Sequence, residues 1–101
     1  MTKLNEILRQ YTTGKKTANE VNKELEKHGF NVRIDPDRCN LTAAQVKDGW
    51  GMLDTGTGTL DPVRMVNNEL VGVDCGEMKA LFFHDGKEYA VHGKKLEEIV
   101  G

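Results

Sequence analysis

The sequence predicts an α+β fold in a single domain over residues 1–101, with helices in its first half and an antiparallel sheet in its second. Before residue 30, apolar residues recur at the spacing of amphipathic helices. After Pro62 they occur in short runs separated by the two-residue turns Asn67-Asn68 and Asp85-Gly86. With 38% hydrophobic residues, a chain of this length can bury one modest core.

The helical part covers about residues 1–48 and begins with a helical hairpin. Residues 2–12 form the first predicted helix, with an apolar stripe of Leu4, Ile7, Leu8 and Tyr11. The second, over 17–28, starts at a capping box, because the Thr17 and Glu20 side chains can each accept a hydrogen bond from the other's backbone N–H. Gly29 suits the left-handed end of this helix.

Two shorter elements complete this half. Residues 30–34 alternate in polarity and predict a short strand. Thr42 and Gln45 form a second capping box, which predicts a short third helix over 42–48. We expect the three helices to pack on one face of the sheet, because helices this short need a surface to pack on.

The sheet itself is predicted as a β-meander over residues 62–92. Its four strands are residues 63–66, 69–73, 78–84 and 87–92. The C-terminal tail, residues 93–101, adds either a short helix or a fifth strand. The prediction is therefore a four- to five-stranded antiparallel meander.

The Asp85-Gly86 turn fixes the register of the last hairpin and bears on metal binding. It places residue 82 opposite 89 and residue 80 opposite 91, so Ala80, Phe82, Tyr89 and Val91 share the predicted core face. His84 then lies at the turn, whereas His92 lies at the far end on the other face, about 20 Å away. Together with Cys75 they cannot hold one ion, whose ligands lie within about 2.3 Å of it. We predict no metal site and no cofactor.

Composition excludes several classes of protein. The net charge of −2 and the isoelectric point of 5.9 argue against a nucleic-acid binder, which normally carries a basic face. No apolar run approaches the roughly 18 residues of a membrane span, and the N-terminal residues lack the apolar core of a signal peptide. Cys39 and Cys75 are expected to be reduced thiols in a cytoplasmic protein, each buried as a small apolar residue.

The Gly/Thr-rich segment 49–61 has the most unusual composition, with the only tryptophan, Trp50. One interpretation is a ligand-binding loop. Trp50 would stack on the ligand, and Asp54, Thr55, Thr57 and Thr59 would contribute with the loop amides. The other interpretation is a structural crossover from the helices to the sheet, with Trp50 buried as its anchor.

Asp54-Thr55-Gly56 also resembles the catalytic signature of retroviral-type aspartic proteases. In that family two aspartates face each other across a dimer axis and share one proton to activate water. The surrounding pattern departs from the family, since that fold is all β and this chain begins with two capped helices. The chain also has no serine and no Gly-x-Ser-x-Gly motif. A hydrolase using Asp54 therefore stays an alternative.

Three segments resemble a group of small uncharacterised single-domain proteins encoded in Firmicutes genomes and their prophages. They are residues 11–17, residues 51–61 and residues 73–78. The resemblance implies an accessory protein that acts by binding. We therefore expect a small, cytoplasmic, non-enzymatic binding or interaction protein whose partner is a protein or a small-molecule ligand. A subunit of a larger assembly, joined through an exposed edge strand, is the remaining alternative.

Overall fold

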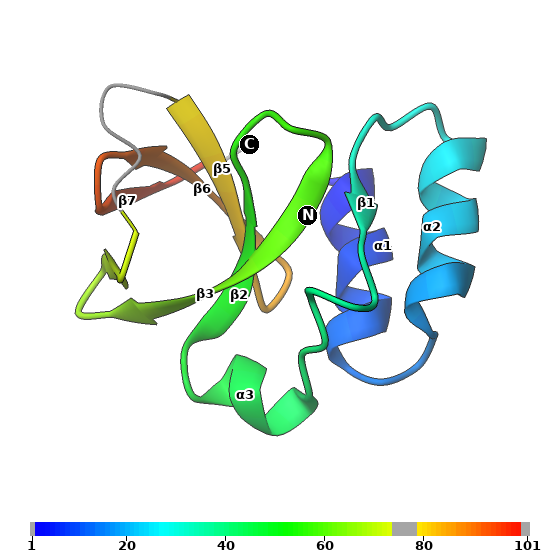
Figure 1. Cartoon of the computed structure of the whole chain (residues 1–101), viewed down its shortest axis with the longest axis horizontal. Coiled ribbons are helices and arrows are strands. Elements are labelled where there is room, and N and C mark those ends of the chain that lie inside the picture. The colour runs from blue at the N-terminus through cyan, green and yellow to red at the C-terminus, as the bar shows by residue number, and fades with distance from the viewer. Residues whose placement is uncertain (1, 74–78, 100–101) are drawn as a thin grey trace.

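The computed structural model describes residues 2–73 and 79–99 and confirms the α+β class. Helices α1 and α2 lie side by side on one flank of a β-barrel, and α3 lies at one end (Figure 1). In chain order the elements are α1 (Lys3–Thr12), α2 (Ala18–Lys27), β1 (Arg33–Ile34), α3 (Ala43–Lys47), β2 (Trp50–Asp54), β3 (Thr59–Val66), β4 (Glu69–Val71), β5 (Lys79–His84), β6 (Lys87–His92) and β7 (Lys95–Glu98). No helix in this described part is long and apolar enough to cross a membrane.

Both predicted capping boxes are confirmed. The Thr17 hydroxyl accepts from the Glu20 N–H at 3.3 Å, and the Glu20 carboxylate accepts from the Thr17 N–H at 3.2 Å. Thr42 and Gln45 make the same pair of bonds, at 3.2 and 2.9 Å, at the start of α3. These side chains satisfy backbone donors that have no partner inside the helix. The caps therefore set where α2 and α3 begin.

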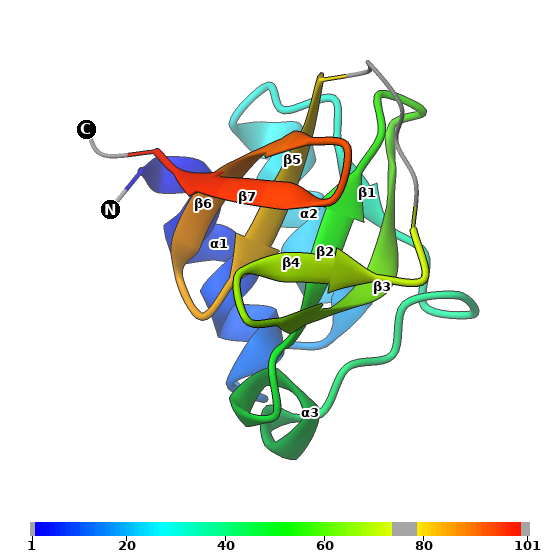
Figure 2. The same cartoon turned by 90° about the vertical axis from the view of Figure 1, so that its left-hand side faces the viewer.

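The sheet is a closed barrel, so the predicted open meander of four or five strands is wrong. Its seven strands follow the order β1-β3-β2-β5-β6-β7-β4, and β4 pairs again with β3. Strands β2 to β7 thus form a six-stranded ring, and β1 adds a strand parallel to β3. The ring closes where Glu69 of β4 pairs with Lys95 of β7. Figure 2 shows these two strands side by side. The predicted tail therefore supplies the closing strand.

Residues 49–61 form a β-hairpin rather than a bare crossover. Strand β2 pairs with residues 60–64 of β3, from Trp50 opposite Arg64 to Asp54 opposite Leu60. Glycine and proline within these strands hide the pattern, because both have low strand propensity. Strand β2 forms nevertheless because it pairs on both sides, with β3 and with β5. The hairpin is one reason that the sheet has more strands than predicted.

The two-residue turns are confirmed. Asn67, Asn68, Asp85 and Gly86 all have positive φ, at 51°, 62°, 44° and 78°. Such angles match the twist of two-residue hairpins, and asparagine, aspartate and glycine tolerate them best. The register of the last hairpin is also as predicted, with Phe82 opposite Tyr89.

Buried side chains form two clusters, one inside the barrel and one beneath the helices. Neighbouring residues on a strand belong to different clusters, because successive side chains point to opposite faces of the sheet. Phe82 points into the barrel, and Phe83 points toward the helices. The inner cluster comprises Leu53, Val63, Leu70, Ala80, Phe82 and Val91, with Tyr89 partly buried against it. The predicted core face of the last hairpin is therefore the barrel interior. The other face is covered by helices at Phe83 and Leu81.

A tyrosine fixes the long loop between β1 and α3. The buried Tyr11 hydroxyl donates to the Cys39 carbonyl at 2.6 Å and accepts from the Leu41 N–H at 3.1 Å. Burial raises the pKa of Tyr11 above its ordinary value of 10.0. The hydroxyl therefore stays protonated and keeps both bonds at neutral pH.

Cys39 lies in the cluster beneath the helices with none of its surface exposed, as expected. Cys75 lies outside the described residues. Burial, together with the nearby carboxylates of Asp61 and Asp35, raises the pKa of the Cys39 thiol from 9.0 to about 12. A thiol with this pKa is protonated at neutral pH, which disfavours nucleophilic attack.

The Cys39 thiol should make the protein sensitive to alkaline pH. In the unfolded chain it ionises near pH 9, whereas in the folded chain it stays protonated up to about pH 12. The free energy of unfolding should therefore fall above pH 9, by up to about 1.4 kcal/mol per pH unit. Urea unfolding between pH 8 and 10 measures this slope, and Cys39→Ala should make it shallower. Equal slopes for the two proteins would contradict the prediction.

Candidate functional site

Trp50 acts as an anchor of the barrel at the start of β2. Its side chain is half-buried and packs against the cluster beneath the helices. Its carbonyl accepts a hydrogen bond from His84 Nδ1 at 2.7 Å, which fixes the imidazole with a proton on that nitrogen. The His84 ring in turn stacks on Phe82, with centroids 6.0 Å apart. This packing fits the structural interpretation of Trp50.

Asp54 shapes the turn between β2 and β3. Its carboxylate accepts from the Gly56 N–H at 2.8 Å, which is an Asx-turn. The hydroxyls of Thr57 and Thr59 lie 3.4 Å apart. The side chains of Asp54, Thr57 and Thr59, which the sequence suggested for ligand binding, therefore make contacts within the turn itself.

The structure does not bring the predicted site residues together. Trp50 and Asp54 lie at opposite ends of β2, about 13 Å apart at the usual rise per residue. The three threonines lie at the Asp54 end of β2. Thr55 and Thr57 belong to the turn, and Thr59 is the first residue of β3. Trp50 cannot stack on a small ligand that these threonines hold. The pairing of two Asp54 carboxylates across a dimer axis stays a prediction.

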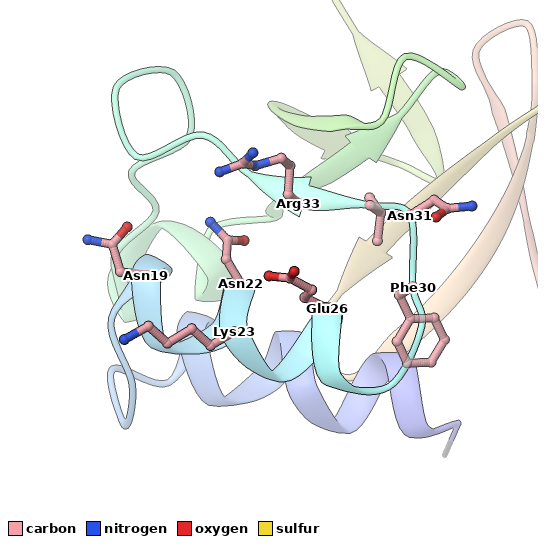
Figure 3. A pocket seen from close by; sticks show the side chains of 8 residues that line it. Asn19, Asn22, Lys23, Glu26, Phe30, Asn31 and Arg33 are labelled. Carbon is pink, nitrogen blue, oxygen red and sulfur yellow. The ribbon is translucent and has the colours of Figure 1, made fainter.

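A groove lies between α2 and the segment that contains β1. This groove has a volume of about 550 Å³ (Figure 3). Figure 3 shows Asn22 and Glu26 pointing from α2 toward the β1 segment, with Arg33 on the opposite wall. Its lining is mainly polar: Asn19, Asn22, Lys23, Glu26, Phe30, Asn31, Val32 and Arg33. We take this α2–β1 groove as the candidate functional site.

Asn22 forms one end of the groove by bridging α2 to β1. Its side-chain NH₂ donates to the Ile34 carbonyl at 2.7 Å, and its side-chain oxygen accepts from the Ile34 N–H at 2.8 Å. On the other side of β1, the Arg33 N–H donates to the Gly58 carbonyl at 2.9 Å. The Asn22 carboxamide therefore covers an edge of the sheet that none of the described strands covers.

Asn22→Ala should lower the free energy of unfolding by about 2 kcal/mol, because it leaves a backbone donor and acceptor of Ile34 without partners. Urea unfolding measures the loss. Asn19→Ala is the matched control, since Asn19 is exposed on the same helix. The control should change stability by no more than about 0.5 kcal/mol. A similar change in both variants would show that the bridge contributes nothing.

The charged side chains of the groove are available to a ligand. Lys23, Glu26 and Arg33 are exposed, and none forms an ion pair with another residue in 2–73 or 79–99. Phe30 adds a half-buried apolar surface. The groove can therefore hold a polar ligand by hydrogen bonds and by charges of both signs.

A smaller hollow lies where the Asp85-Gly86 turn meets the helices. It has a volume of about 240 Å³ and is lined by Thr12, Thr13, Ala43, Val46, Lys47, His84 and Asp85. Its hydroxyls are not activated for catalysis, because Thr12 and Thr13 both donate to the Arg9 carbonyl, at 3.2 and 2.7 Å. Arg9 also donates to the Asp85 carbonyl at 3.1 Å and lies 3.6 Å from its carboxylate. The contacts thus attach the turn to α1.

Among residues 2–73 and 79–99, no three His, Cys, Asp or Glu side chains lie close enough together to hold a metal ion. The confirmed register keeps His84 and His92 at opposite ends of the last hairpin, where they face Lys87 and Lys79. The groove has a single carboxylate, Glu26, and no histidine. Its side chains suit an organic ligand better than a metal.

The sequence contained a weak indication of this groove. Asn22 interrupts the apolar side of α2 next to Val21, and a half-buried asparagine in a helix usually has a specific hydrogen-bond partner. The identity of that partner depends on the return of the chain after Gly29, which α2 alone does not specify.

Comparison of the chain with protein-family models, with curated proteins and with solved structures gives no match.

Proposed function

We propose that this chain is a non-enzymatic binding module and that the α2–β1 groove is its ligand site. The observation that carries the proposal is the groove itself, which is the larger of the hollows described and has a polar lining from two elements. Its volume lies in the usual range of small-molecule sites. The free, buried thiol of Cys39 fits a reducing compartment such as the cytoplasm.

The segment 49–61 supports this site from behind. The Gly58 carbonyl holds β1 at Arg33, and Thr59 pairs with the same residue. The Gly/Thr-rich turn thus positions a wall of the groove while its own polar groups make local bonds. In this proposal Thr59 contributes through its backbone, and Trp50 contributes through stability.

An NMR titration of the ¹⁵N-labelled full chain tests the proposal. The probes are the twenty common amino acids and four common ribonucleotides, added one at a time. We expect at least one probe to shift amides of residues 19–33. A set of shifts confined to the hollow around His84 and Asp85, or no shifts at all, would refute the assignment of the site.

A matched pair of lysine variants sharpens this test. Lys23 lines the groove, whereas Lys27 lies on the same helix but does not line it. Lys23→Ala should lower the affinity for an anionic or zwitterionic probe by about two- to five-fold, as expected from the loss of an exposed ion pair. Lys27→Ala should leave the affinity unchanged. Equal weakening would indicate only a general effect of net charge.

A further inference from the structure

We propose that the groove contains a slot for one primary carboxamide and that its ligand is a free carboxamide amino acid, glutamine or asparagine. The inference rests on the proposed function, because it names the ligand class of the same groove. It depends on how Asn22 binds β1, on the backbone position next to that contact, and on the charges around it.

Asn22 shows the binding mode. Its carboxamide donates one hydrogen bond and accepts one, and so satisfies both backbone groups of Ile34. Both bonds are short, at 2.7 and 2.8 Å. The free edge of the β1 segment therefore accepts a carboxamide as if it were a peptide group of a neighbouring strand.

Val32 offers the next such position along the same edge. Residues 32–34 alternate as buried, exposed and buried, which is the pattern of extended chain. The Arg33 N–H points to β3 and the Ile34 N–H to α2, so alternation directs the N–H and C=O of Val32 to the groove. No hydrogen bond of these two groups to another described residue is found. Val32 is 8% exposed and lines the groove, so a ligand that enters the groove can reach both groups.

Glu26 lies opposite this position but cannot fill it. It follows Asn22 by one helical turn, about 6 Å, which matches the roughly 6.6 Å between Ile34 and Val32. Figure 3 shows its side chain pointing toward the β1 segment. A carboxylate accepts hydrogen bonds but does not donate, so it would leave the Val32 carbonyl without a donor. A carboxamide supplied by a ligand satisfies both groups.

The other charges of the groove suit a free amino acid. Glu26 can bind its α-ammonium group, and Lys23 and Arg33 can bind its α-carboxylate. A glutamine side chain within a polypeptide lacks both of these charges. The charged lining therefore favours the free amino acid over a partner protein as the source of the carboxamide.

NMR titration of the ¹⁵N-labelled full chain with L-glutamine tests the slot. We expect shifts centred on the amides of Val32 and Arg33, and binding about ten-fold weaker for L-glutamate, which lacks the donor. Equal binding of both amino acids would overturn the carboxamide slot. N-acetyl-L-glutamine methylamide, which has the carboxamide without the charges, should bind more weakly than glutamine. Equal or tighter binding of this capped form would overturn the free amino acid as the source.

Two variants of Glu26 separate the slot from the charge. Glu26→Gln adds a carboxamide that can form hydrogen bonds with the Val32 backbone from within the chain. It should therefore raise the urea midpoint of unfolding and lower the affinity for glutamine by about ten-fold or more. Glu26→Ala leaves the slot open and should lower the affinity for glutamine by only about two- to five-fold. Equal weakening by both variants, with unchanged urea midpoints, would overturn the slot.

The outcomes distinguish this inference from the proposed function. Shifts of groove amides with other probes but not with glutamine or asparagine would overturn the carboxamide slot and leave the binding site in place. An absence of groove shifts with every probe would overturn both.

Discussion

Gly51→Ala should lower the free energy of unfolding by about 3 kcal/mol or more, at the upper end of the cost of overpacking. A Cβ at this position would lie 2.4 Å from the Phe82 ring and 2.5 Å from the Phe83 carbonyl. The ring is completely buried inside the barrel, and the carbonyl belongs to strand β5, which pairs with β2. Neither can move without disturbing the sheet. Urea unfolding measures the loss.

Gly56→Ala is the control for this substitution. A Cβ at Gly56 would meet no heavy atom within 4 Å, but the residue has a φ of +91°. The strained backbone alone should cost about 1 kcal/mol. The difference between the two variants therefore reports the steric conflict at Gly51. Equal losses would contradict the close approach of Phe82 to the β2 backbone.

Tyr11→Phe should lower the free energy of unfolding by about 3 kcal/mol, since it leaves two buried backbone groups without partners. These groups, the Cys39 carbonyl and the Leu41 N–H, belong to the loop that joins β1 to α3. The benzene ring remains in place, so little packing is lost. Urea unfolding measures the change, and hydrogen exchange should show faster exchange of the Leu41 amide.

Tyr89→Phe is the matched control. Tyr89 is half-buried against the barrel interior, and no hydrogen bond of its hydroxyl to a described residue is found. We expect a change within about 0.5 kcal/mol. A loss as large as that of Tyr11→Phe would mean that removal of any tyrosine hydroxyl destabilises this protein, independently of the loop.

Features that a few adjacent residues determine were predicted from the sequence. The boxes at Thr17 and Thr42 and the turn at Asp85 depend on side chains within three positions of each other. The hairpin register followed from that turn, because a two-residue turn fixes every pair beyond it. The helices and the last hairpin were therefore predictable.

The closure of the barrel depends on contacts between distant residues and was missed. Strand β3 pairs with β2 through residues 60–64 and with β4 through residues 64–66, which curves the sheet. Strand β7 has the short sequence Lys95–Glu98 with one apolar residue, Leu96, and has no strand pattern of its own. It forms because β6 and β4 offer it unpaired edges.

The candidate site was missed for a similar reason. The sequence directed attention to the Gly/Thr-rich segment, because glycine and threonine are typical of binding loops. The groove instead depends on the antiparallel return of residues 30–34 along α2, which places Asn22 and Ile34 in contact. Each wall is ordinary in sequence, and only their juxtaposition creates a polar hollow.

The closing of the ring by β7 has a consequence for the synthesis of the chain. Strands β2, β3 and β4 leave the ribosome before β5, β6 and β7, and β3 can then pair with both β2 and β4. Strand β4 lacks its second neighbour until residues 95–98 have emerged. Until then β4 and β6 both have an exposed edge, on which strands of other nascent chains can add. Premature termination before Lys95 should therefore produce aggregates rather than a smaller soluble barrel.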